Sequence, residues 1–149
     1  MNNIYSISSY KSFIGHEGYG FNCHLLENNV KVAFVINEGD GGCHSWQWMD
    51  KDARQRYFDH LATLPERLEH PIEFHDHFIN VMIDKFEFDK KLKKLCKKST
   101  VFTIKDQDRN YYRTLNIEYI VPNIDRIVAY LNDKFGIGNF EIINQQFCK

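Results

Sequence analysis

Two copies of a Cys-His dipeptide, Cys23-His24 and Cys43-His44, contain the residues of this chain best suited to chemistry. Thiols and imidazoles are the ligands that zinc prefers, and a thiol next to an imidazole is also the arrangement of a cysteine nucleophile. Both dipeptides fall in segments with a strand-like pattern, where successive side chains point to opposite faces. One strand therefore cannot present both side chains to the same metal.

A metal site made of histidines from different segments is the alternative that the spacing leaves open. His16, His24 and His44, together with Asp40, would supply three nitrogens and a carboxylate to zinc, with a position for water. Such a site would support a metal-dependent hydrolase or nuclease. Without it we find no catalytic constellation, and we favour a protein that is not an enzyme and holds no cofactor.

The remaining cysteines and histidines give weaker signals. Cys96 and Cys148 have no CxxC spacing to the other two cysteines, so we interpret all four as buried free thiols. His75 and His77 form an H-x-H pair in the sequence EFHDHF, after His70. We interpret this pair as part of a solvated connection before a long helix, with a weak capacity to bind a metal or a proton.

The glycine-rich segment GHEGYG, residues 15–20, superficially resembles a phosphate-binding loop. Its spacing is GxxGxG rather than GxGxxG, a strand pattern rather than a helix follows it, and no Walker lysine is present. We therefore expect a loop shaped by glycine. A third hypothesis is that this loop, the glycine cluster at residues 39–42 and nearby aromatic side chains hold a nucleotide-like signalling molecule.

Charge is distributed unevenly along the chain although the net charge is only −1. Residues 1–84 contain six basic and twelve acidic residues, whereas residues 85–98 contain seven lysines and two acids. Lysines without interleaved arginine or aromatic residues are poor readers of bases, so we expect sequence-independent contact with nucleic acid or an acidic protein. The candidate binding residues on this helix are Lys90, Lys91, Lys93, Lys94, Lys97 and Lys98. His16, Glu17, Tyr19 and Asp40 in the two glycine loops form the second candidate surface.

The composition is that of a globular protein, with 43% hydrophobic and 15% aromatic residues in 149. This length predicts one domain over residues 1–149. The N-terminus lacks a charged segment followed by an apolar one, and no apolar run approaches the roughly 18 residues that a spanning helix needs. We therefore expect a cytoplasmic protein that does not enter a membrane.

Hydrophobic periodicity predicts an α+β fold, with an N-terminal antiparallel β-meander, two helices, a β-hairpin, a helix and a final strand. Residues 1–14 form either an opening strand or an extended arm. The other expected strands are residues 21–26, 30–36, 43–48, 100–105, 111–121 and 140–147. The expected helices are residues 50–64, 76–98 and 122–135, the first with Asp50 as its N-cap.

The N-terminal meander resembles small uncharacterised proteins encoded by bacteriophages and mobile elements. These open with a GHEG-like turn, an FN-type strand, a K-x-A-x-V strand and a glycine-rich turn. The matching residues here cover about a fifth of the chain and are Gly15, His16, Glu17, Gly18, Phe21, Asn22, Leu25, Lys31, Ala33, Val35, Gly39, Gly41 and Gly42. The resemblance implies an accessory protein that inhibits a host defence system, such as a CRISPR-type system, and it transfers no catalytic residues.

We therefore expect a phage-type accessory or inhibitor protein in the host cytoplasm. It would act by binding a host protein or ribonucleoprotein complex, with the lysine-rich helix and the glycine loops as the candidate contacts.

Overall fold

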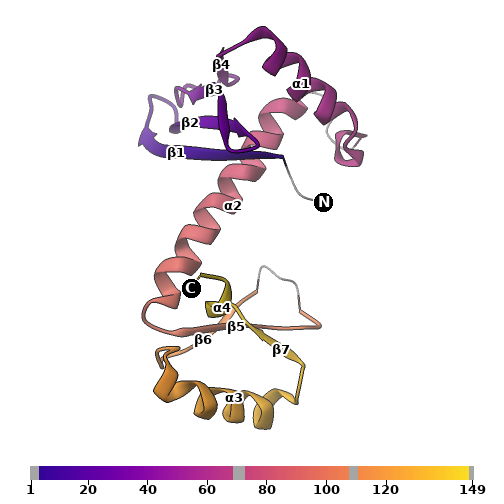
Figure 1. Ribbon diagram of the computed structural model, residues 1–149. Coiled ribbons are helices and arrows are strands. Elements are labelled where there is room, and N and C mark those ends of the chain that lie inside the picture. The colour runs from indigo at the N-terminus through magenta and orange to yellow at the C-terminus, as the bar shows by residue number, and fades with distance from the viewer. Residues whose placement is uncertain (1–3, 69–72, 108–110, 148–149) are drawn as a thin grey trace. The chain divides into compact units, whose positions relative to one another are not determined.

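The computed structural model describes residues 4–68, 73–107 and 111–147, and it confirms the α+β class (Figure 1). His70, Cys148 and part of the turn predicted before residue 111 lie outside the described residues. The chain divides into two compact units, residues 1–86 and 87–149, with the boundary inside helix α2 (Phe74–Cys96). The prediction of a single domain stays a prediction, and each unit is described by itself.

Among the described residues of the first unit, strands form a four-stranded antiparallel sheet in the order β1-β2-β3-β4. Their bounds are Tyr5–Ile14, Tyr19–Glu27, Val30–Asn37 and Ser45–Trp48. The opening segment is thus a paired strand. The third expected strand is shorter than predicted, because Cys43 and His44 precede β4 rather than belonging to it.

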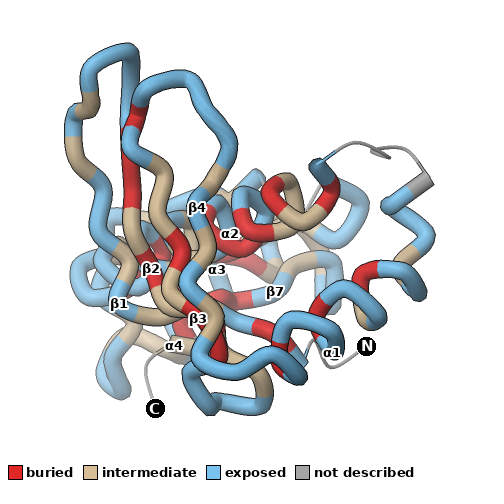
Figure 2. Tube along the Cα trace, turned by 90° about the horizontal axis from the view of Figure 1, so that it is seen from above, coloured by how far each residue is buried: buried red, intermediate tan, exposed pale blue. Residues whose placement is uncertain are grey.

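The alternation predicted for β2 is confirmed. Phe21, Cys23 and Leu25 are buried in the core of the first unit, whereas His24 on the opposite face is only half-buried. Figure 2 shows buried positions along β2 and β3 and the exposed loop ends of the hairpins. One face of the sheet therefore supplies the core.

Helix α1 (Lys51–Ala62) and the first half of α2 complete this core. Asp50 caps α1 as predicted, because its carboxylate accepts a hydrogen bond from the Ala53 amide. Helix α1 ends at Ala62, and a 3-10 turn, η1 (Pro65–Leu68), follows. Helix α2 begins at Phe74, so His75 and His77 lie in its first turns and the predicted solvated connection is wrong for them.

The second unit contains another antiparallel sheet, in the order β6-β5-β7 within its described residues. Its elements are β5 (Thr100–Ile104), β6 (Arg113–Leu115), α3 (Val121–Phe135), β7 (Phe140–Ile142) and α4 (Asn144–Phe147). One cluster of buried side chains joins the end of α2 to β5 and to Ile143 after β7, and a second joins the sheet to α3.

Two of the expected strands are wrong in extent. The predicted strand 111–121 pairs with β5 only over residues 113–115, because its partner begins at Thr100, and Ile117 and Tyr119 pack against the α3 core instead. The predicted strand 140–147 ends at Ile142. There Asn144 turns the backbone out of the sheet and starts α4.

Asn144 is fully buried and bonds three backbone groups far away in sequence. Its Oδ1 accepts from the Val101 amide at 2.6 Å, and its Nδ2 donates to the carbonyls of Cys96 at 3.1 Å and Ser99 at 2.9 Å. Together these bonds satisfy the end of α2 and the start of β5.

We predict that Asn144→Ala lowers the free energy of unfolding by about 2–4 kcal/mol, because buried backbone groups lose their partners. Urea denaturation followed by circular dichroism measures this effect. Asn139→Ala is the matched control, since Asn139 is exposed and donates one bond to the Phe135 carbonyl. A cost below about 1 kcal/mol is expected there. Equal costs for both variants would contradict the role given to Asn144.

Candidate functional site

Two glycine loops of the first unit contact each other through their backbones. We call residues 14–19 and 38–42 together the loop tip. The Gly15 amide donates to the Gly18 carbonyl at 2.7 Å, and the Glu17 amide donates to the Gly39 carbonyl at 2.8 Å. A Cβ added to Gly15 would lie 2.3 Å from the Glu38 carbonyl oxygen. Glycine is therefore required because the two backbones are in contact.

The remaining bonds of the loop tip leave it poorly suited to phosphate. The Gly39 amide donates to Asn37 Oδ1 at 2.8 Å, and the Gly42 amide donates to Asp40 Oδ1 at 3.0 Å. A phosphate loop needs amides that point at the ligand. Here the amides of Gly15, Glu17, Gly39 and Gly42 are all used within the protein.

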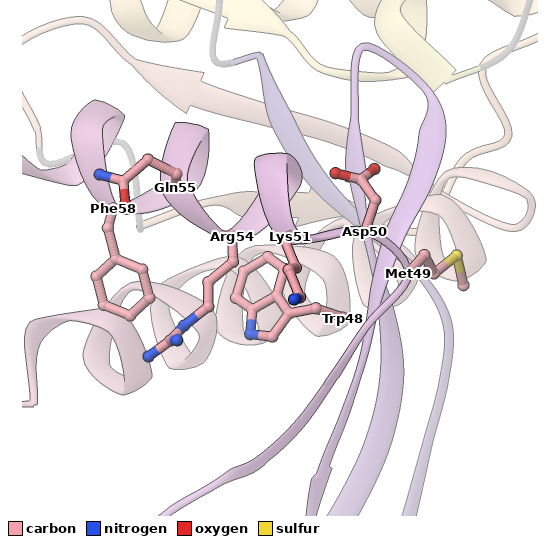
Figure 3. A pocket seen from close by; sticks show the side chains of 7 residues that line it. All are labelled: Trp48, Met49, Asp50, Lys51, Arg54, Gln55 and Phe58. Carbon is pink, nitrogen blue, oxygen red and sulfur yellow. The ribbon is translucent and has the colours of Figure 1, made fainter.

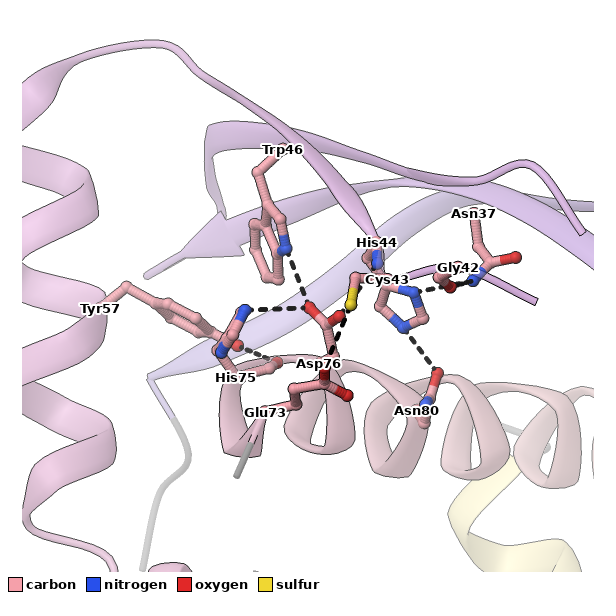
Figure 4. Close-up of polar contacts among 10 residues, drawn as sticks. All are labelled: Asn37, Gly42, Cys43, His44, Trp46, Tyr57, Glu73, His75, Asp76 and Asn80. Atoms are coloured by element: carbon pink, nitrogen blue, oxygen red, sulfur yellow. Dashed lines mark hydrogen bonds and ion pairs between the residues drawn. The ribbon is translucent and has the colours of Figure 1, made fainter. Parts of the chain in front are cut away.

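A buried carboxylate, that of Asp76 in the first turn of α2, anchors the strand that follows the second loop (Figure 4). Its Oδ1 accepts from the Trp46 indole at 3.0 Å and lies 3.3 Å from His75 Nε2. Its Oδ2 accepts from the His44 amide at 2.9 Å. These bonds offset the cost of burying the charge and hold β4 against the start of α2.

The His44 ring is held by two asparagines. The Gly39 amide fixes the orientation of the Asn37 side chain, so that Asn37 Nδ2 faces His44 Nδ1 at 3.0 Å. Nδ1 must then accept, and the proton resides on Nε2, 3.1 Å from Asn80 Oδ1. Both ring nitrogens are engaged, so neither is open to a metal or to a thiol.

Cys43 does not have the surroundings of a catalytic nucleophile. It is exposed, which corrects the expectation that it is buried, whereas Cys23 and Cys96 are buried as predicted. Its Sγ donates to Glu73 Oε1 at 3.1 Å. This bond and the carboxylate charge raise the pKa of the Cys43 thiol, the opposite of what a thiolate nucleophile requires.

The alternative metal set of His16, His24, Asp40 and His44 does not come together. No group of three or more metal-binding side chains is found in the described part of the chain. His24 lies on the sheet face opposite the core, beside Phe34, where burial and then Lys31 lower its pKa. His16 and Asp40 are exposed in the loops, and the His44 ring lies against Phe21 and Asn80.

A recess of about 690 Å³ lies between the loop tip and the first turns of α2. Of the predicted binding residues, Glu17 and Tyr19 line it, while His16 and Asp40 do not. Its other lining groups include the carboxylates of Glu73 and Asp76. This negative charge disfavours a nucleotide, whose phosphates would face the carboxylates.

A second recess, of about 650 Å³, lies where β4 meets α1 (Figure 3). The Arg54 guanidinium lies 5.6 Å from the centre of the Phe58 ring, beside Trp48 and Met49. None of the predicted site residues lines this recess.

The six predicted lysines are all exposed in the second unit. Four of them, Lys90, Lys91, Lys93 and Lys94, lie on the last turns of α2, and Lys97 and Lys98 follow its end. Positive charge there also stabilises the helix, because it faces the negative end of the helix dipole. Solvation and helix stability therefore explain part of this pattern without any ligand.

The most exposed apolar side chains of the loop tip are Ile14 and Tyr19, each 83% exposed. They are opposite each other in the β1–β2 pair, at the strand ends that flank the first loop. Sequence reasoning identified Tyr19 but missed Ile14, whose position at the end of an apolar strand gave no sign of exposure.

Comparison with protein-family models, with curated proteins and with solved structures finds no match for this chain. In the described residues, no helix combines the length and apolar character needed to cross a membrane.

We predict that Gly39→Ala separates the two loops. Gly39 has φ of +72°, and an added Cβ would lie 2.8 Å from the Gly20 nitrogen and 2.9 Å from the Gly18 carbonyl oxygen. We expect a loss of about 2 kcal/mol of stability and faster hydrogen exchange at the Glu17 amide, measured by NMR. Gly18→Ala is the matched control, because its added Cβ meets nothing within 4 Å. Unchanged exchange in Gly39→Ala would contradict the backbone contact.

We also predict that Asp76→Asn detaches β4 from α2. An amide group in place of one oxygen would face an N–H donor, so a charge-assisted bond worth about 1.5–3 kcal/mol is lost. Both tryptophans of the chain lie on β4, so urea denaturation followed by tryptophan fluorescence reports this region directly. Asp40→Asn, at an exposed carboxylate that accepts one loop amide, should change stability by less than about 0.5 kcal/mol. Similar losses in the two variants would refute the anchoring role.

Proposed function

We propose that this protein acts by binding another macromolecule, and that the loop tip recognises a protein partner. The observation that carries the proposal is the exposure of Ile14 and Tyr19 on loops that are held in one conformation. Large exposed apolar groups on a rigid loop can enter a partner's pocket with little further loss of conformational entropy. Tyrosine is also among the residues that dominate binding energy at interfaces.

The charges around Ile14 and Tyr19 suggest the chemistry of the partner. Glu17, Glu38 and Asp40 are exposed carboxylates of the loop tip. A complementary surface would offer an apolar pocket for the Tyr19 ring, surrounded by basic side chains. The same carboxylates would slow association with an acidic protein.

The hydrogen bonds of Cys43 and His44 within the protein support binding rather than catalysis. A hydrolase built on Cys43 and His44 would need a thiol or an imidazole that can exchange protons with a substrate. In this cluster the His44 ring is engaged at both nitrogens, and the Cys43 thiol donates to Glu73. These groups fix the second loop in place, and binding is the function that such a rigid loop supports.

The resemblance of the N-terminal meander to phage and mobile-element proteins extends this proposal. It would place the partner in a host defence system, as a protein or a ribonucleoprotein complex. The protein itself would then act as an inhibitor in the host cytoplasm.

Site-specific photocrosslinking tests the proposal. Tyr19 is replaced by p-benzoylphenylalanine, which keeps an aromatic ring at this position, and the protein is irradiated in an extract of the cells where it normally acts. We expect one defined protein adduct, which untagged wild-type protein suppresses. An Ile14→Asp competitor should need at least about tenfold higher concentration, because interface residues of this kind contribute more than about 1.4 kcal/mol.

The control places the same photoreactive group at Val30, which is 65% exposed at the opposite end of β2 and β3. No adduct with the same protein is expected from this position. An adduct that forms equally well from both positions, or one that Ile14→Asp suppresses as well as wild type does, would contradict recognition by the loop tip.

A further inference from the structure

The second unit brings aromatic side chains next to the lysines of α2, although they are distant in sequence. The Lys91 ammonium lies 5.8 Å from the centre of the Tyr112 ring. The Tyr112 ring also contacts Phe88, at 5.9 Å between ring centres, one turn earlier on α2. Tyr112 therefore lies between Phe88 and Lys91 of α2, a neighbour that the sequence of the lysine run does not reveal.

Tyr111 and Arg113 extend this surface on either side of Tyr112. Tyr111 is 71% exposed, and it lines a recess of about 420 Å³ together with Gln107, Tyr112 and Arg113. The Arg113 guanidinium lies 5.5 Å from the centre of the Phe135 ring, so that it too is held in place. The surface thus combines the exposed ring of Tyr111 and the ring of Tyr112 with the lysines of α2.

The net charge of this unit has the sign that phosphates require. Residues 87–149 contain twelve basic and eight acidic residues, a net charge of +4, whereas residues 1–86 contain seven basic and twelve acidic residues, a net charge of −5. Lys90 and Lys94 are exposed one helical turn apart, and Lys98 follows beyond the helix end. Cations in such a row can contact successive phosphates of one strand.

We infer that this surface binds single-stranded nucleic acid without sequence preference. The lysines contact the phosphates, and the rings of Tyr111 and Tyr112 stack on the bases. In a duplex the base faces are covered by their neighbours, so only a single strand can use both features. An acidic protein would use the lysines but would leave the exposed Tyr111 ring without a role. This inference concerns a different unit from the loop tip and stands independently of its proposed partner.

Fluorescence anisotropy with the whole chain tests the inference. The probes are labelled 15-nucleotide strands of oligo(dT) and oligo(rU) and a DNA duplex of the same length, each titrated at several salt concentrations. We expect both single strands to bind more tightly than the duplex, with affinity that falls as salt rises.

Two variants separate stacking from charge. Tyr111→Leu should weaken binding of the single strands about tenfold, with an unchanged salt dependence, because only a stacked base is lost. The triple variant Lys90→Gln, Lys94→Gln and Lys98→Gln should lower the slope of log affinity against log salt by about 2, since each phosphate contact in a single strand contributes about 0.7. All four substituted positions are exposed, and circular dichroism confirms that each variant is folded.

Matched controls lie in the first unit. The triple variant Lys11→Gln, Lys31→Gln and Lys51→Gln removes the same charge from exposed lysines of that unit and should retain the wild-type salt slope. Tyr19→Leu removes a ring that is also largely exposed, and it should leave strand affinity unchanged while it weakens binding of the loop-tip partner. The two proposals can therefore fail separately.

Two outcomes would overturn the inference. One is the absence of binding to either single strand even at low salt. The other is equal affinity for single strands, duplex and heparin together with no effect of Tyr111→Leu, which would identify a general polyanion surface such as one for an acidic protein.

Discussion

The carboxylate of Asp76 is the interaction on which the arrangement of the first unit depends. It is buried, and it accepts hydrogen bonds from the Trp46 indole and the His44 amide, both of which come from the far side of the second glycine loop. A buried charge is tolerated only when its partners are in place, so the carboxylate selects one position for β4 against α2. The loop is fixed at its other end by the bond from the Glu17 amide to Gly39. The second loop of the loop tip is therefore anchored at both of its ends.

The glycines of this region allow the two loops to make close backbone contact, and its polar residues hold the second loop through hydrogen bonds. Gly15 and Gly39 lack the side chains that would force the two loops apart. The Gly39 amide orients the Asn37 side chain, and Asn37 Nδ2 then donates to His44 Nδ1. The His44 proton therefore resides on Nε2, which donates to Asn80 on α2. A sequence rich in histidine, cysteine and glycine thus forms a scaffold. This scaffold leaves the large apolar side chains of Ile14 and Tyr19 exposed.

The features that could be predicted from the sequence are those that depend on local periodicity. The alternation of β2, the Asp50 cap and the exposure of the lysines all follow from neighbours within a few residues. The features that could not be predicted depend on distant partners. Asp76 meets a tryptophan 30 positions away, and Asn144 meets an amide 43 positions away and thereby ends a strand that periodicity extends to residue 147. The contact of Lys91 with Tyr112 could not be predicted for the same reason, because the two residues are far apart in sequence.

The opposite charges of the two units favour a division of roles between them. Under the two proposals, the acidic loop tip would favour a basic protein surface over phosphates, whereas the basic unit with its exposed Tyr111 would favour a single strand. The charge of the chain is divided in the same way, with a net charge of −5 in residues 1–86 and +4 in residues 87–149. A ribonucleoprotein offers basic protein and exposed nucleic acid together, so it is the class of partner that could engage both proposed surfaces.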